Sequence, residues 1–555
     1  MFIKLTKHFW IKLLRDTRDF FVTNPLLVPI IILCLGTFLW QRGYFLSLDW
    51  LYGPEIKLVP TQYYPNQIPW IYLQKIFSLI IPAWILQKVV IISFFVIAYL
   101  SIKRFVYSFT TDRVINELVA LFYIFNPFFY SRVIQGQWAI VLAYGLLPLI
   151  FASLFSYIKE ATWKKAWSIG LISAVIISLS SHYIFFLIAV AVIFLVFYFP
   201  KIKWKHLFIF IGVPLILNSY WLFNINQTTN LSRFSQLDQL AFANTKLATN
   251  SYYLDLLSLH GFWGEKYSRF QSIYQINHYW WVIFIFIFIF VLGGAFLSFK
   301  KKSRAGYAML ALCIVSFILA SGAQGTIFSG FNNWLYDHIP GYIGLREANK
   351  WLTILVIGYA YFIIEFFKFL FNKKLVIDNK KVITFIIGII IVGYGAGLLF
   401  GFNGQLYASD YPVSWYKLKN KFSDDKTNRY YSILALPWHQ SMSFNFSKKI
   451  IMNPVGLFFD GHNSHVLFGD NLEIGLIYSQ STRAESKVVE RYVRQSPPYS
   501  NEVKTSFIND LKKIGINYIV LFKEVDWVKY KLWFENNNSS VIEEDNQDFL
   551  YIRLK

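Results

Sequence analysis

The chain has 555 residues, of which 56% are hydrophobic and 20% aromatic, and its mean hydropathy is +0.43. A soluble core of this size cannot bury so much apolar surface, so the composition excludes an ordinary soluble protein and indicates a polytopic membrane protein. The formal net charge of +22 could attract nucleic acid or anionic lipid, and the position of each Lys and Arg decides between them.

Windows of roughly 20 apolar residues, the length that a helix needs to cross a bilayer core, predict about eleven membrane crossings. They lie near residues 21–40, 84–102, 114–130, 138–158, 165–181, 183–199, 206–224, 278–299, 305–321, 351–371 and 382–401. No small-residue cleavage site follows the first window, so we interpret it as a retained signal anchor. Residues 1–20 before it predict a cytoplasmic amphipathic helix at the membrane surface. Cys34 and Cys313 both lie in apolar windows, so no disulfide framework is expected.

The basic residues support this arrangement because the cytoplasmic loops of membrane proteins are enriched in Lys and Arg. With the N-terminus inside, every predicted inner segment is basic, whereas the outer turns near 131–137 and 181–183 hold one Arg and no Lys. We therefore predict a multi-pass plasma-membrane protein with a cytoplasmic N-terminus. The Lys and Arg residues then mark the cytoplasmic side and attract the lipid bilayer, and no nucleic acid is expected as a partner.

The residues outside the predicted spans gather on the extracytoplasmic side. A transmembrane domain over residues 21–404 carries three long outer segments, 41–83, 225–277 and 322–350, whereas its inner loops are short. The remaining residues, 405–555, contain strand-like runs and a stretch in which helical spacing ends at Gly515 before the strand-like NYIVLF. The predicted fold is mainly α, a helix bundle with an extracytoplasmic α/β domain, so the protein is expected to work at its outer surface.

Asp49, in LSLDWLYGPE, is a lone carboxylate among aromatic residues, and Glu55 follows six residues later. A carboxylate at the membrane surface is costly if it is buried and ordinary if it is solvated. The stretch therefore leaves two readings open, a functional carboxylate and a polar residue that keeps the loop hydrated.

Two further clusters lie at predicted outer ends of spans. In NPFFYSRVIQGQW, Pro127 disfavours a continuing helix, so the third span is expected to end there and to leave Arg132, Gln135 and Gln137 in a tight outer turn. His182, in SLSSHYIFF, lies at an outer corner between two apolar helices. Each cluster is consistent with two roles: it stabilises the connection between two helices, or it binds sugar or phosphate.

The segment GLREANKW directly precedes the tenth span. If the helix begins there, Arg346 and Lys350 lie four residues apart on one face, and Glu347 and Trp351 share the neighbouring face. Two cations at a helix N-terminus oppose the helix dipole unless an anion binds between them, so phosphate is the expected ligand.

Other motifs are absent or weak. The sequence has no phosphate-binding GxxxxGK[ST] loop, no zinc-type cluster of His and Cys, and no GxSxG elbow. His260 and Glu265, in the second long outer segment, form no metal-ligand pattern and are weaker candidates.

The architecture resembles the GT-C type integral-membrane glycosyltransferases: about eleven spans, a long first outer loop with an Asp shortly after the first span, and an outer soluble domain. FFYSRVIQGQW and LREANKW are similar to segments of arabinofuranosyltransferase-like and YfhO-like bacterial membrane proteins, as are PWHQSMSF and GDNLEIGLIYSQS of the outer domain. The resemblance implies transfer of a sugar from a polyprenyl-phosphate carrier to a glycan, lipid or protein acceptor of the cell envelope.

The same resemblance implies a role for each candidate residue. Asp49 would be the general base, and the cations of LREANKW, beside Glu347, would hold the departing phosphate. The groups that orient sugar or phosphate would be Arg132, Gln137 and His182, with Glu55 as a further binding candidate. No cofactor is expected, because the paired acidic motif that would hold a divalent metal in the family is not matched in LSLDWLYGPE.

Two other functions stay open at this point. A transporter or flippase of a lipid-linked glycan would use the basic outer residues only for binding, and should show polar residues on the inner side of the same cavity. A cell-envelope scaffold would need no catalytic Asp at all. The enzyme is favoured because the inner loops are short and topology explains their charges.

Overall fold

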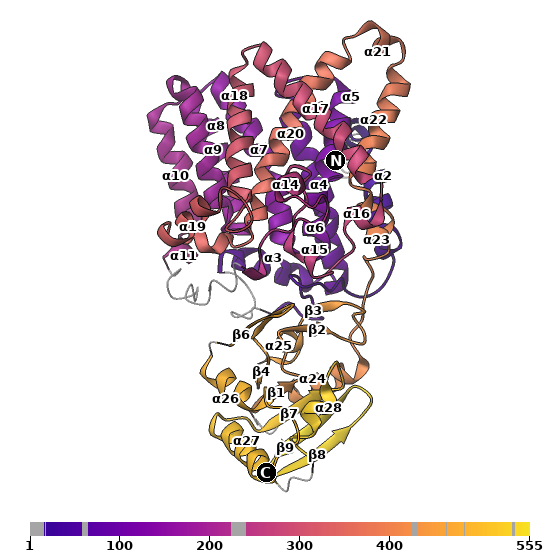
Figure 1. The fold of residues 1–555 in the computed structure, drawn as a ribbon, viewed down its shortest axis with the longest axis vertical. Coiled ribbons are helices and arrows are strands. Elements are labelled where there is room, and N and C mark those ends of the chain that lie inside the picture. The colour runs from indigo at the N-terminus through magenta and orange to yellow at the C-terminus, as the bar shows by residue number, and fades with distance from the viewer. Residues whose placement is uncertain are drawn as a thin grey trace, which may run out of the picture.

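The computed structural model describes residues 16, 18–57, 65–223, 240–423, 430–461, 463–481, 483–535 and 539–555. Most of the predicted N-terminal amphipathic helix lies outside these residues, as do parts of the outer segments 41–83 and 225–277. Figure 1 shows a helical part, from α2 (Leu27–Leu35) to α23 (Leu399–Asn403), and, at one end of it, a smaller part with the described strands and the C-terminus.

The helical part contains the predicted spans. Its principal helices are α2 (Leu27–Leu35), α4 (Ala83–Val106), α5 (Arg113–Ile124), α6 (Pro127–Gln135), α7 (Trp138–Lys159), α8 (Trp163–Leu179), α9 (Tyr183–Tyr198), α10 (Trp204–Leu217), α17 (Trp280–Lys300), α18 (Arg304–Ala320), α20 (Leu352–Leu370) and α22 (Lys380–Tyr394). Shorter helices stand between them: α3 (Ile68–Ser78), α11 (Ser219–Leu222), α14 (Tyr252–Leu257), α15 (Trp263–Lys266), α16 (Ile273–Ile276), α19 (Ser329–His338), α21 (Lys374–Asp378) and α23 (Leu399–Asn403).

Apolar helices long enough to cross a membrane confirm a multi-pass membrane protein, but they do not confirm the number eleven. Among the described residues five helices reach that length and hydropathy, or up to seven if two bent pairs each count as one span. One bent pair is α5 with α6, at 47°, and three further apolar helices have only 10–17 residues. The eleven apolar windows all coincide with helical segments, but several of these are broken or short.

The break between α5 and α6 corrects the expected turn at Pro127. The Asn126 side chain accepts a hydrogen bond from the backbone N–H of Phe129 and so caps a new helix, and Pro127 occupies its first turn, where no N–H is needed. Arg132 and Gln135 therefore lie on α6 rather than in a tight turn. The helix ends at Gly136, whose φ of +83° suits glycine, and Gln137 precedes α7.

The start of α20 also differs from the conditional expectation for GLREANKW. The α-helix begins at Leu352, after two 3₁₀ turns, η5 (Tyr342–Leu345) and η6 (Ala348–Trp351). Arg346 lies between these turns. Glu347, whose φ of −85° and ψ of 75° are not helical, separates Arg346 from Lys350. The two cations therefore do not share one face of an α-helix.

The C-terminal part contains a five-stranded sheet in the order β4-β1-β7-β9-β8. Its strands are β1 (Tyr431–Leu436), β4 (Ser464–Leu467), β7 (Tyr518–Phe522), β8 (Ser540–Asp545) and β9 (Phe549–Leu554). β1 pairs in parallel with β4 and β7, whereas β9 is antiparallel to β7 and β8. The predicted strands YYSILALP and NYIVLF are β1 and β7, and FLYIRLK is β9. The helix predicted before Gly515 is α27 (Asn501–Lys513).

Strands β1, β7 and β9 are buried on both faces, whereas the edge strand β8 is mostly exposed. Successive side chains of a strand point to opposite sides, so the buried strands contribute to two cores. Leu434 and Ile519 face a core that includes residues of α26 (Ala484–Val493) and α27. Ile433 and Val520 face the core that is continuous with the helical part. That second face packs with α24 (Val413–Ser423), α25 (Val455–Phe459) and the hairpins β2–β3 (Ser441–Ser443, Ile450–Met452) and β5–β6 (Leu472–Ile474, Ile477–Ser479) on the side of the membrane helices. α28 (Trp527–Lys531) follows β7.

Candidate active site

Asp49 lies in the loop after α2, and the end of α6 holds that loop in place. The backbone N–H of Asp49 donates to the carbonyl of Gln135 at 3.1 Å, and the Trp50 ring stacks on Trp138 with centroids 6.3 Å apart. Gly136 lets the two segments approach, since a Cβ there would lie 1.8 Å from Ser47 Oγ. The Asp49 side chain is exposed to solvent, although protein surrounds it closely.

Gln137 joins Asp49 to a second carboxylate, that of Glu347. Gln137 Nε2 donates to Asp49 Oδ2 at 2.8 Å and to Glu347 Oε2 at 3.1 Å. Arg132 NH1 in turn donates to Gln137 Oε1 at 2.7 Å and to Glu347 Oε2 at 3.0 Å. The loop after α2, α6 and the segment before α20 thus converge on one network, and Asp49 is its exposed member.

Arg132 is the buried centre of this network, with only 1% of its surface exposed. Its guanidinium lies over the rings of Phe128 and Phe262, at 5.1 and 4.3 Å from their centroids. Arg132 NH2 also donates to Asn349 Oδ1 at 2.6 Å. The aromatic rings and the acceptors of NH1 and NH2 orient the guanidinium, whereas its buried Nε makes no hydrogen bond.

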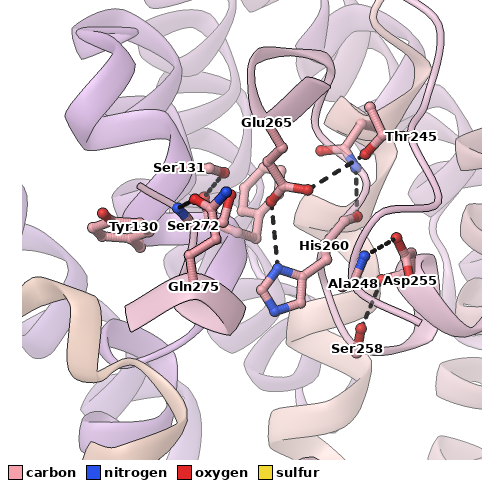
Figure 2. A network of polar contacts seen from close by, with 12 residues as sticks. Tyr130, Ser131, Thr245, Ala248, Asp255, Ser258, His260, Glu265, Ser272 and Gln275 are labelled. Atoms are coloured by element: carbon pink, nitrogen blue, oxygen red, sulfur yellow. Dashed lines mark hydrogen bonds and ion pairs between the residues drawn. The ribbon is translucent and has the colours of Figure 1, made fainter. Parts of the chain in front are cut away.

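Asn349 connects the network to a second layer of polar contacts. Its Nδ2 donates to the backbone carbonyl of His260 at 2.9 Å. Figure 2 shows this layer: the His260 ring and Thr245 both approach the carboxylate of Glu265, at 3.4 Å in each case. The three residues are buried, so this layer supports the loop under Arg132. Asn349 was not among the residues predicted from the sequence, although it stands between Glu347 and Lys350 in LREANKW.

Lys350 and His182 form the other end of the network. Lys350 Nζ lies 3.4 Å from Glu347 Oε2 and 3.2 Å from His182 Nε2, and the same Nε2 lies 3.0 Å from the carbonyl of Gly344. Burial, and then Lys350, lower the pKa of His182 to about 3, so its ring is neutral. A neutral ring makes one of these two contacts at a time: Nε2–H donates to Gly344, or bare Nε2 accepts from Lys350.

The charges in the site leave an excess of cations. The protein that closely surrounds the Asp49 carboxylate desolvates it, and this desolvation, followed by the charge of Glu347, raises the pKa of Asp49. Lys350 and Arg132 outweigh the desolvation of Glu347 and hold its pKa below the usual range. Arg346 is half-buried, lies 4.3 Å from the ring centroid of Phe242 and acts electrostatically on Glu347. Three cations, Arg132, Arg346 and Lys350, therefore face two carboxylates. This balance suits a bound anion.

Six predicted site residues share these hydrogen bonds and ion pairs, and a seventh, Arg346, acts on them electrostatically. Glu55 lies apart: its carboxylate pairs with Lys419 of α24 at 2.5 Å, and this contact joins the loop after α2 to the C-terminal part. Among the described residues, no group of three His, Cys, Asp or Glu side chains could hold a metal ion.

The sequence matches no protein-family model and no curated protein. The fold is similar to that of a solved structure, the arabinofuranosyltransferase AftD from Mycobacteria, with a TM-score of 0.61 at 11% identity. The match covers 97% of this chain and 40% of AftD, so the chain spans about two fifths of the length of that protein. The oligosaccharyltransferase of Archaeoglobus fulgidus matches over 89% of this chain and 64% of its own, at 11% identity and a TM-score of 0.46. At this identity the likeness to AftD shows a shared fold.

Proposed function

We propose that the protein is a membrane glycosyltransferase that moves a sugar from a polyprenyl-phosphate donor to a glycan, lipid or protein acceptor on the extracytoplasmic side. One observation carries the proposal. The exposed carboxylate of Asp49 shares the amide of Gln137 with the buried Glu347, which Arg132 and Lys350 hold. The fold likeness to AftD supports the same class of reaction.

Asp49 is proposed as the general base. A carboxylate oxygen takes the proton of an acceptor hydroxyl while the hydroxyl oxygen bonds to the anomeric carbon of the donor sugar. The bond from that carbon to the phosphate oxygen breaks, and the phosphate leaves with the electron pair. The raised pKa makes Asp49 a stronger base than an ordinary carboxylate, while it stays ionised at neutral pH.

Arg346 and Lys350 are proposed to receive the departing phosphate. Negative charge grows on the phosphate oxygens during transfer, and cations that are already in place stabilise it. Lys350 is suited to this role because its contact at His182 is exchangeable. When Lys350 turns to a phosphate, His182 Nε2–H donates to the Gly344 carbonyl instead, and neither group is left without a partner.

Substitution of Asp49 by Asn tests the proposal in membranes supplied with a labelled polyprenyl-phosphate sugar. The Asn side chain keeps an acceptor for Gln137 but cannot take a proton, so we expect transfer to fall by about 10²- to 10⁴-fold while the donor still binds. Glu55→Gln, which changes a carboxylate of the same loop outside the network, is the matched control and should retain activity. Transfer by Asp49→Asn at the wild-type rate would refute the role of Asp49.

A further inference from the structure

Arg269 is a cation near Asp49 that the network above does not use. It follows α15, and the backbone next to it is firmly held. The Phe270 ring packs near those of Phe262 and Tyr130, with centroid distances of 6.0 and 5.8 Å. Tyr130 Oη donates to the carbonyl of Gln271 at 2.5 Å. Since Tyr130 belongs to α6, the segment that carries Arg269 is attached to the helix that carries Arg132.

The side chain of Arg269, by contrast, has no partner among the described residues. It is half-buried, and its Nε atom is shielded from solvent and makes no hydrogen bond. Its electrostatic interactions are with Asp49 and Tyr267. A partly desolvated guanidinium without hydrogen bonds costs free energy, which an anion bound to its fork would offset.

The cations of the site fall into two sets. Arg346 and Lys350 act on Glu347 and lie beside His182, at the end proposed to receive the phosphate of the donor. Lys350 and Arg132 also act on Asp49, and Arg269 acts on it from the segment after α15. A general base must approach the hydroxyl that it deprotonates, so the acceptor lies on the Asp49 side and comes within reach of Arg269.

The C-terminal part reaches the same segment. Gly475, in the turn of the β5–β6 hairpin, has a φ of +60°, and a Cβ on it would lie 2.5 Å from a ring carbon of Tyr267. The outer part therefore packs directly on a residue two positions from Arg269. An acceptor at Arg269 lies where the helical part and the C-terminal part meet.

We propose that Arg269 binds an acidic group of the acceptor, so that the acceptor is an anionic glycan and the arginine sets its specificity. This inference rests on the proposed function and names the substrate class of the same site. The guanidinium would pair bidentately with a carboxylate or phosphate group of the acceptor, and that contact would place a neighbouring hydroxyl at Asp49.

Binding of two matched probes to the full chain in nanodiscs tests this. p-Nitrophenyl β-glucuronide and p-nitrophenyl β-glucoside differ in one carboxylate, and their dissociation constants can be measured by saturation-transfer NMR titration. We expect the wild-type protein to prefer the glucuronide by about tenfold, the usual size of a charge-assisted contact. Arg269→Gln should remove this preference and leave glucoside binding unchanged, and Arg269→Lys should keep part of it. Arg42→Gln, which removes an exposed cation of the first outer loop, should keep the full preference for the glucuronide.

Three results would overturn the inference: equal binding of both probes by the wild-type protein, a preference that survives Arg269→Gln, or a preference lost in Arg42→Gln. Farnesyl phosphate is the probe for the donor side. If Arg269→Gln weakens the binding of farnesyl phosphate and leaves glucuronide binding unchanged, Arg269 binds the donor phosphate and the inference is wrong. The proposed function fails separately, through unimpaired sugar transfer by Asp49→Asn, whatever the probes show.

Discussion

Asp49 and Glu347 accept hydrogen bonds from one amide nitrogen, Gln137 Nε2, yet their surroundings differ. Glu347 is buried and contacts Arg132 and Lys350, so its charge is compensated. Asp49 is exposed and has no ion pair of its own within the described part of the chain. Two neighbouring carboxylates whose pKa values are driven apart can take different roles. The structural role then belongs to Glu347, and the proposed proton transfer belongs to Asp49.

Glu347→Gln should change the pH dependence of sugar transfer. The negative charge of Glu347 helps to raise the pKa of Asp49, and its removal also frees Arg132 and Lys350 to favour the ionised form of Asp49. The pKa of Asp49 should therefore fall. Since the base works only when it is ionised, the acid limb of the rate profile should move to lower pH.

Rates of sugar transfer measured from about pH 4 to 8 check this prediction, because the range spans ordinary and raised carboxyl pKa values. Glu55→Gln should leave the limb in place, and a limb that moves to higher pH in Glu347→Gln would contradict the assignment.

Gln137→Leu should lower the turnover of sugar transfer by about 100-fold, the usual cost of a small misplacement of a catalytic group. The change removes both the bridge to Asp49 and an acceptor of Arg132 while it roughly keeps the volume. Gln135→Leu is a matched control on the same stretch, because Gln135 Nε2 is buried and makes no hydrogen bond. Single-turnover kinetics of both variants give the comparison. Equal losses in the two variants would mean that general packing, rather than the bridge, explains the effect.

Gly136→Ala should displace the first outer loop from the end of α6. The added Cβ would meet Ser47 Oγ at 1.8 Å and Trp50 Cβ at 2.8 Å, and the backbone has a positive φ that alanine disfavours. Gly404→Ala separates the two effects, because Gly404 has a similar φ of +76° and nothing within 4 Å of its Cβ position. We expect transfer to fall strongly in Gly136→Ala and little in Gly404→Ala. Comparable activities of the two variants would show that the contact with Ser47 does not position Asp49.

The sequence was sufficient to locate the segments of the site, because polar residues at the ends of apolar windows stand out. LSLDW, YSRVIQGQW and LREANKW all contribute to the network, and the helix-to-strand pattern around Gly515 was correct. These features depend on local spacing and on the cost of polar groups near a membrane, which a single sequence displays.

Features that depend on tertiary contacts could not be predicted in this way. Arg132 belongs to a new helix because Asn126 caps it, whereas Pro127 alone suggested a turn. Glu55 was a binding candidate because it shares a loop with Asp49, but it pairs with Lys419, which is remote in sequence. Asn349 carries no charge and so gave no signal, although it joins Arg132 to the His260 layer.

His439 should make the stability of the C-terminal part depend on pH. Its Nδ1 lies 2.7 Å from Glu473 of the β5–β6 hairpin and its Nε2 lies 3.1 Å from Asp526, just before α28. Burial disfavours the charged ring, but the contacts with Asp526 and Glu473 outweigh it and raise the pKa of His439 to about 9. A folded-state pKa above the unfolded value of about 6.5 means that the stabilisation is complete below pH 6.5. It is lost as the pH rises through about 9.

Thermal unfolding of the full chain in nanodiscs should therefore show a midpoint temperature that falls over this pH range. His439→Gln should unfold at a lower temperature below pH 6.5, and its midpoint should depend much less on pH. His465→Gln is the control, because His465 is more exposed and contacts one carboxylate, that of Asp460. An unchanged slope in His439→Gln would show that the two contacts do not hold the hairpin against α28.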